Sequence, residues 1–291
     1  MKTNKKLKNA VLLISNLLVI IIIISCKNNI VDEPIIEPRP VIRLAGEYFY
    51  ADWGPTGRLA VIYMQQTEDG ENHYLETRGL YTIRIDGTDR QLVLLNSDVG
   101  DFILNPVWSP DGEWIAFSAG GEIFKVRPDG SDLTRLTYGG GTKFGPSWSP
   151  DGDGIAFRVF YGPGDALGLW KVRTDGKSII QFRKPPPEER CPGCGGGDNA
   201  IWGVGSGVSW SSNGREILYV EDSYNRHLAI YDTTTARVEF IYYAPSTIYR
   251  PSFSPDGSEI LFVVGRLNGH PGGIALINRD GSGLRWLRQD G

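Results

Sequence analysis

The sequence has few of the residues from which small metal and disulfide scaffolds are built. Its 291 residues include three cysteines and three histidines. A framework of several disulfides or a four-cysteine zinc site would need more cysteines. No two histidines have the H-x-x-x-H spacing of a helical metal site. The sequence therefore predicts no resident metal and no other cofactor.

A cluster of basic residues is also lacking after the first ten positions. The chain has 30 Lys and Arg against 34 Asp and Glu, a net charge of −4. Removal of residues 1–25 would take away four lysines and no acid, leaving 26 basic against 34 acidic residues and a net charge of −8. A protein this acidic, without a basic stripe, is not expected to bind nucleic acid.

The sequence has one long hydrophobic run, at the start of the chain. A basic segment of ten residues precedes Val11 to Ile24, which is interrupted only by Ser15 and Asn16. This is the shape of a signal peptide, and the run is short for a permanent span of about 20 residues. The run ends in Ser25-Cys26, which resembles a bacterial lipoprotein cleavage box and implies that Cys26 carries the lipid. An uncleaved anchor helix is the alternative.

These features predict three parts of the chain. Residues 1–25 are the signal peptide, residues 26–40 are a flexible tether that contains Pro34, Pro38 and Pro40, and residues 41–291 are the folded domain. The expected location is the cell envelope, on the periplasmic or surface side of a bacterial membrane, with the membrane contacted through the lipid anchor only.

The folded part is built from a repeat, best seen from Asn105 to Tyr138. Each copy predicts four short strands, with a tight turn of the type Ser-Pro-Asp-Gly after the first strand and a second tight turn after the third. The second turn ends in Asp-Gly in four copies and reads Asp-Thr-Thr at Asp232 in the other. The first turn recurs five times, as WGPTG at Trp53, WSPDG at Trp108 and Trp148, WSSNG at Trp210 and FSPDG at Phe253. A period of about 40 residues with four strands is typical of a propeller blade.

The same motifs resemble the repeats of the TolB-type β-propeller family, most closely at Pro106 to Leu136 and at Pro146 to Val172. The resemblance implies an all-β propeller of four-stranded antiparallel blades and an envelope role in protein contacts. Five repeats are visible, and a six-bladed ring with one irregular blade is the alternative. The aromatic residue before each turn is predicted to be a packing anchor, and the turn aspartates are predicted to bond to their own turn backbones.

Strand parity predicts which face of the propeller binds a partner. The tight turns follow the first and third strands and lie on one face, here named the turn face. The longer connections follow the second and fourth strands and lie on the other, the loop face, where binding residues usually occur. The predicted loops are 65–78, 160–168, 184–207 and 265–273. The candidate binding residues of the loop face, rich in aromatic side chains and Arg, are Tyr74, Tyr161, Asp165, Trp202, Tyr224, Arg226, His227, Tyr249, Arg250 and His270.

Two further features of these loops have open interpretations. His73, His227 and His270 lie at or near them, and would form a metal site only if they converged near the axis. Cys191 and Cys194 are two residues apart in a Pro- and Gly-rich loop. In an exported protein this spacing favours a local disulfide, while redox-active thiols and a shared metal are the alternatives.

No catalytic motif is visible. The chain contains no G-x-S-x-G, and the nearest string, at Gly203 to Gly207, has the wrong spacing. We therefore predict a non-catalytic scaffold that binds a protein or peptide, or a glycan, through the loop face. The alternative is an envelope lyase or hydrolase, acting on glycan or peptide, with its active site at the propeller axis. An axial cluster of His and acidic side chains would favour the enzyme, and an aromatic and Arg patch would favour binding.

Overall fold

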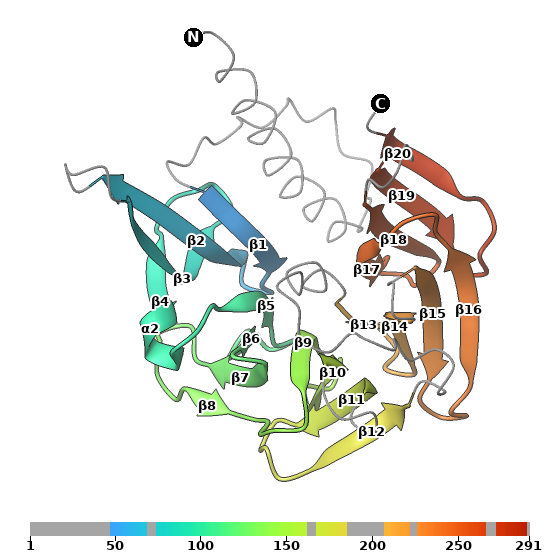
Figure 1. Cartoon of the computed structure of the whole chain (residues 1–291), viewed down its shortest axis with the longest axis horizontal. Coiled ribbons are helices and arrows are strands. Elements are labelled where there is room, and N and C mark those ends of the chain that lie inside the picture. The colour runs from blue at the N-terminus through green and yellow to red at the C-terminus, as the bar shows by residue number, and fades with distance from the viewer. Residues whose placement is uncertain are drawn as a thin grey trace, which may run out of the picture.

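The described part of the chain forms five antiparallel sheets of four strands each. The computed structural model describes residues 47–68, 74–161, 167–184, 207–221, 226–265 and 272–289. Within every sheet the strands are neighbours in sequence order. The sheets surround a common centre as the blades of a propeller (Figure 1). The predicted all-β propeller with five visible blades is confirmed for these residues.

Each blade takes its four strands from one repeat. The strands of blade 1 are β1 (Glu47–Trp53), β2 (Arg58–Glu68), β3 (Tyr74–Arg84) and β4 (Gln91–Leu95). Those of blade 2 are β5 (Leu104–Trp108), β6 (Ile115–Ala119), β7 (Glu122–Val126) and β8 (Thr134–Arg135). Those of blade 3 are β9 (Thr142–Trp148), β10 (Gly154–Tyr161), β11 (Gly168–Arg173) and β12 (Ile179–Arg183).

The last two blades follow the same order. The strands of blade 4 are β13 (Ser209–Trp210), β14 (Glu216–Glu221), β15 (His227–Asp232) and β16 (Val238–Tyr243). Those of blade 5 are β17 (Ile248–Phe253), β18 (Glu259–Val264), β19 (Gly273–Asn278) and β20 (Arg285–Gln289). A single helical turn, α2 (Asn96–Val99), follows blade 1. In the part of the chain that the structure describes, no helix has the length and apolar character needed to cross a membrane.

The first strand of every blade is the innermost one. β1, β5, β9, β13 and β17 lie nearest the centre in Figure 1. Side chains on β1, β9 and β13 bond to the blade that follows. The Asp52 carboxylate accepts a hydrogen bond from the Trp108 backbone N–H at 2.7 Å, and the Ser147 and Ser209 hydroxyls accept similar bonds from Trp210 and Phe253 at 3.4 and 3.5 Å.

The Ser-Pro-Asp-Gly turns are closed by their own side chains, as predicted. In blade 2 the Ser109 hydroxyl donates to Asp111 at 2.5 Å and accepts from the Trp114 backbone N–H at 2.9 Å. Asp111 also accepts from the Glu113 backbone N–H. These bonds to the ionised carboxylate lower the pKa of Asp111, chiefly through the Ser109 hydroxyl. The turn aspartates therefore have a structural role.

Apolar clusters fill the spaces between neighbouring blades. Four clusters join blades 1 and 2, 2 and 3, 3 and 4, and 4 and 5. Trp108, Trp148 and Phe253 belong to these clusters and are at most 8% exposed, and Trp210 packs against the cluster between blades 3 and 4. A fifth cluster contains Leu59 and Ile83 and comes from blade 1 alone. Among the described residues, no apolar cluster joins blade 5 to blade 1.

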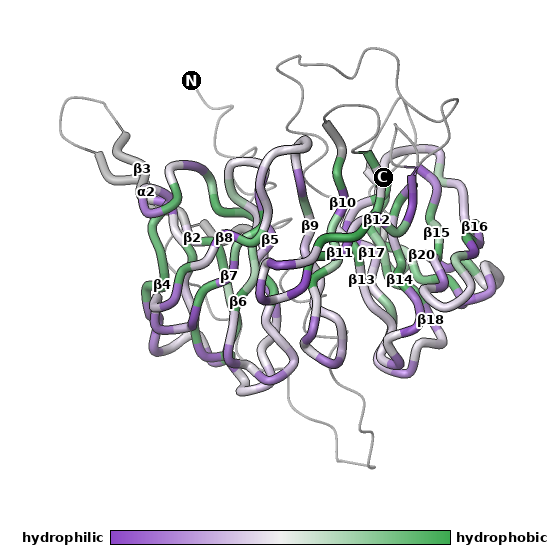
Figure 2. Tube along the Cα trace, turned by 90° about the horizontal axis from the view of Figure 1, so that it is seen from below, coloured by the Kyte–Doolittle hydropathy of each residue, from purple (hydrophilic) through white to green (hydrophobic). Residues whose placement is uncertain are grey.

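Hydrophilic turns line the lower edge of Figure 2, with hydrophobic strand segments between the two faces.

One predicted loop is shorter than expected, because most of 65–78 is strand. β2 extends to Glu68 and β3 begins at Tyr74, and these two residues are paired across the hairpin. Thr, Tyr and Leu residues suit an extended pair of strands, so this segment lengthens blade 1. The predicted signal peptide and tether, residues 1–40, lie outside the described residues.

Candidate functional site

The structure describes only some of the predicted binding residues. Tyr74 begins β3 and Tyr161 ends β10, both at the loop-face ends of their strands. Arg226 and His227 lie where β15 begins, and Tyr249 and Arg250 lie on β17. The remaining candidates lie outside the described residues: Cys26, His73, Asp165, Cys191, Cys194, Trp202, Tyr224 and His270.

Two of the predicted residues form a cluster with two aromatic side chains at the loop-face end of blade 4. The His227 ring lies 4.6 Å from the Tyr243 ring and 5.7 Å from the Phe240 ring, measured between centroids. The Arg226 guanidinium carbon lies 5.3 Å from the Tyr243 centroid. Phe240 and Tyr243 are 53% and 51% exposed. These four residues are named the blade-4 patch.

A bulge in the outermost strand brings the two aromatics together. Tyr242 pairs with Leu228 and Phe240 pairs with Ala229, so Ile241 has no partner in the ladder. In a regular strand, residues three apart point to opposite faces. The extra residue reverses this alternation, and both Phe240 and Tyr243 reach His227. The sequence contains no local signal for this bulge, which is why Phe240 and Tyr243 were not among the candidates.

Tyr249 and Arg250 were predicted in a loop, but both lie within the inner strand β17. β17 begins at Ile248, directly after a short connection from blade 4, so little loop remains. Arg250 reaches across to blade 1, where its guanidinium carbon lies 4.2 Å from the centroid of the Tyr50 ring. Arg250 therefore belongs to the inner strands and not to the rim.

The charge of Arg250 also acts on Asp52, a carboxyl group on the same strand as Tyr50. Asp52 accepts backbone hydrogen bonds from Trp108 and Trp53. Burial raises the pKa of Asp52 to about 6, outweighing these bonds and the charge of Arg250, which lower it. Burial also lowers the pKa of Arg250, while the charges of Tyr50 and Asp52 raise it. Tyr50, Asp52 and Arg250 are named the axial group.

Two other groups of buried charges lie between blades. Glu122 of blade 2 accepts from Thr137 at 2.5 Å and from the Gly139 backbone N–H at 2.8 Å, and it pairs with Lys143 at 3.1 Å. Lys143 also donates to the backbone oxygens of Gly139 and Gly141. These contacts fix the connection from β8 to β9 on the loop face.

The second buried group joins blades 3 and 4. Glu221 accepts from the Tyr219 hydroxyl at 2.6 Å and pairs with Arg183 at 3.1 Å. Burial, followed by the neighbouring charge of Glu221, raises the pKa of Tyr219. Because the carboxylate is already bonded to both partners, this group stabilises the interface between the blades.

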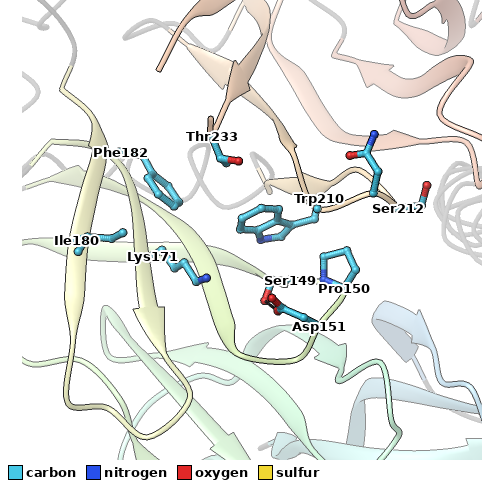
Figure 3. Close-up of a pocket in the computed structure, with 11 residues that line it drawn as sticks. Ser149, Pro150, Asp151, Lys171, Ile180, Phe182, Trp210, Ser212 and Thr233 are labelled. Carbon is cyan, nitrogen blue, oxygen red and sulfur yellow. Dashed lines mark hydrogen bonds between the residues drawn. The ribbon is translucent and has the colours of Figure 1, made fainter. Parts of the chain in front are cut away.

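A pocket of about 410 Å³ lies between blades 3 and 4 on the turn face, where the sequence predicts tight turns and no binding residues. In Figure 3 the Trp210 indole lies at its centre, with Phe182 and Lys171 on one side and Pro150 and Asp151 on another. The Phe182 ring lies edge-on to Trp210 at 6.4 Å. The lining is a mixture of turn residues and inter-blade packing residues, without a convergent set of catalytic groups.

A metal site is not visible in the described ranges. No group of three or more His, Cys, Asp or Glu side chains in those ranges is placed to hold a metal ion. The axial group contains one carboxyl group and no histidine. Its aromatic and Arg side chains match the pattern expected of a binding site.

Comparisons with known proteins give the fold. The sequence matches no protein-family model and no curated protein. TolB from Agrobacterium tumefaciens superposes with a TM-score of 0.60 at 17% identity, covering 84% of this chain and 82% of that one. TolB from Acinetobacter baumannii gives a TM-score of 0.59 at 18% identity over 81% of this chain. The match spans 53% of that TolB chain, which is about half of its length.

An enzyme shares the same architecture. A puromycin-hydrolyzing peptidase from Mycobacterium tuberculosis superposes with a TM-score of 0.62 at 14% identity, over 84% of this chain and 38% of its own. Identities this low relate the proteins by architecture and leave activity undecided. The described part of the chain is a five-bladed, all-β propeller with the fold of the TolB propellers.

Proposed function

We propose that this protein is a lipid-anchored, non-catalytic propeller of the bacterial cell envelope that binds a protein or peptide through its loop face. The observation that supports the proposal is the blade-4 patch. Exposed aromatic side chains beside an Arg are the composition of interface anchors. Among the described residues, blade 5 shows no aromatic cluster at the equivalent edge, where Gly273 pairs with Gln289.

The contacts within the patch preorganise it for binding. His227 contacts both aromatic rings, and Arg226 lies over one of them. A partner that covers Phe240 and Tyr243 would remove apolar surface from water without ordering mobile side chains. The patch is small, so a short peptide or one edge of a protein partner is the expected occupant.

Capture of envelope proteins by the full-length protein in detergent tests this function. Replacement of Phe240 and Tyr243 by Ala should reduce recovery of the partner at least tenfold. Leu287→Ser is the matched control, because Leu287 is also 53% exposed and lies on the outermost strand of blade 5. Equal recovery with all three proteins would rule out the blade-4 patch as the binding surface.

The lipid anchor has a separate test. Growth with a labelled fatty acid should label the full-length protein, and Cys26→Ser should abolish the label. Cys191→Ser should keep it, because this cysteine is not at the end of a signal peptide. Label retained in Cys26→Ser would contradict lipidation at this residue.

The second candidate function is an envelope lyase or hydrolase that acts on glycan or peptide. The raised pKa of Asp52 favours it, because perturbed carboxyl groups are frequent in active sites. Release of fragments from peptides or acidic glycans should then depend on this group and be lost in Asp52→Asn. Activity that is equal in both proteins would remove Asp52 from any catalytic role.

A further inference from the structure

The inner strands share an unusual backbone position. The residue three places before each repeated aromatic is Tyr50, Asn105, Gly145, Gly207 and Arg250 in blades 1 to 5. Four of them are left-handed, with φ of 54° at Tyr50, 52° at Asn105, 61° at Gly145 and 46° at Arg250. The ladder between the first and second strands shifts register at these positions.

This position is a glycine in blades 3 and 4, where a left-handed backbone carries no steric penalty. Blades 5, 1 and 2 are consecutive around the ring and have Arg, Tyr and Asn instead. A left-handed conformation is unfavourable for bulky residues such as Arg and Tyr. Strained residues of this kind concentrate at ligand sites, which makes the three polar side chains candidates for one site.

The hydrogen-bonding groups of this site are only partly used. Within the described residues, the Arg250 guanidinium makes no hydrogen bond or ion pair, and its close contact is the face of Tyr50. Asp52 instead accepts backbone N–H groups. Asn105 is 8% exposed, and its Oδ1 has no hydrogen-bond partner among those residues. A buried amide oxygen without a donor is uncommon in a folded protein.

The charge around Tyr50 is positive in an otherwise acidic protein. Arg250 and Arg78 both lie close enough to lower the pKa of Tyr50, although burial has the larger, opposite effect. Asp52 is the acidic group whose pKa responds to Arg250. A guanidinium at this position, with no ion pair among the described residues, favours an anionic ligand.

We propose that Arg250, together with Tyr50 and Asn105, binds the terminal carboxylate of a peptide chain at the propeller axis. The planar guanidinium fork matches the two oxygens of a carboxylate. The Asn105 carboxamide complements a peptide group, which offers an N–H next to the chain end. This inference rests on the proposed peptide-binding function for its class of ligand and concerns a site other than the blade-4 patch.

Calorimetric titration of the full-length protein in detergent tests the inference with two probes. These are N-acetyl-dialanine with a free carboxylate and the same compound as its terminal amide. The acid should bind at least tenfold more tightly, because only a carboxylate accepts two charge-assisted bonds from the guanidinium. Equal affinity for the two probes, or no binding of either, would overturn the inference.

Variants of Arg250 locate the site. Arg250→Gln should remove the tenfold preference for the acid, and Arg250→Lys should keep only part of it, because an ammonium group lacks the fork. Arg173→Gln is the control, since Arg173 is 54% exposed on the turn face. If Arg250→Gln does not fold, as judged by thermal unfolding, Arg250→Lys decides. An unchanged preference in the variant that decides would refute the assignment.

Two more measurements separate this inference from the others. D-Glucuronate is the third probe. If it binds as tightly as the peptide acid, and if Arg250→Gln abolishes its binding, the assignment of a peptide as the ligand is overturned. The Phe240 and Tyr243 double variant should keep its preference for the acid probe while losing partner capture. Partner capture that persists without any probe binding would reject the axial site and leave the proposed function standing.

Discussion

Single residues in the inner strands carry the features that distinguish one blade from another. Asp52 occupies the position of Ser147 and Ser209, and accepts the same inter-blade bond with a carboxylate in place of a hydroxyl. Gly54 replaces the turn serine of the other blades. Each of these departures from the repeat has a measurable consequence.

Asp52 should make the protein less stable as the pH rises from about 4 to 6. Its folded-state pKa of about 6 exceeds the ordinary value of 3.8. The folded state therefore holds the proton more tightly, and this stabilisation is complete below pH 4 and lost through pH 6. Asp52→Asn keeps the acceptor for Trp108 and should be more stable than wild type by roughly 3 kcal/mol at pH 7, at about 1.4 kcal/mol for each pKa unit.

Urea unfolding of both proteins from pH 4 to 8 measures this difference. The two free energies of unfolding should converge at pH 4. A wild-type protein that gains stability relative to Asp52→Asn as the pH rises would mean that the charge of Arg250 outweighs burial.

Gly54 should not tolerate the serine found in the other blades. A Cβ atom at this position would lie 2.8 to 2.9 Å from the Trp108 ring, which is 7% exposed and unable to move away easily. Gly54→Ser should lower the free energy of unfolding by about 1–3 kcal/mol. Gly207→Ala, with no atom of the described residues within 4 Å of the added carbon, should change it by less than about 0.5 kcal/mol. Equal effects of the two substitutions in thermal unfolding would contradict the packing argument.

At the scale of strands and connections, the buried pair of Glu122 and Lys143 holds the connection from β8 to β9. Lys143 is 3% exposed. Lys143→Met would leave Glu122 with Arg135, Thr137 and one backbone N–H, and should destabilise the protein by about 2–3 kcal/mol. Lys177→Met, at an exposed turn position, should have an effect below about 0.5 kcal/mol.

A double-mutant cycle checks whether the pair acts as a unit. Glu122→Gln combined with Lys143→Met should cost less than the sum of the two single substitutions, because neither charge is then left without its partner. Additive effects in urea unfolding would show that the two side chains stabilise the connection independently.

The strands themselves were predictable, because turn residues at fixed spacing and alternating hydrophobic residues mark each of them. Asp111 and Trp108 have the predicted structural roles for this reason. The blade-4 patch was only half predicted. Arg226 and His227 stand beside a recognisable connection, but Phe240 and Tyr243 meet them through a bulge that no residue type announces. The axial group depends on a contact between the first and last repeats, which local spacing cannot predict.

At the scale of the whole molecule, the blades differ in how well they are enclosed. Blades 2, 3 and 4 have shared apolar clusters on both sides, whereas blades 1 and 5 share such a cluster on one side only, as far as the described residues extend. Local opening is easier where fewer buried contacts must be broken. Blades 1 and 5 should therefore unfold locally before blades 2, 3 and 4.

Hydrogen exchange measured by mass spectrometry tests this difference. Backbone amides of β6, β10 and β14 should exchange more slowly than those of β2 and β18, although all five are second strands. Equal protection across the five blades would mean that blades 5 and 1 are joined as firmly as the other neighbours.

The hydrogen bonds between inner strands all run the same way around the ring. Each acceptor side chain serves the blade that follows it, and the counterpart in the last blade, Ser252, donates to the Phe253 backbone oxygen of its own strand. The hydroxyl oxygen of Ser252 is thus not engaged by another described blade. A copy of the repeat appended after blade 5 could therefore donate its backbone N–H to this oxygen, but it would have to separate Arg250 from Tyr50, so gene duplication could lengthen this protein only by giving up the contact between its first and last blades.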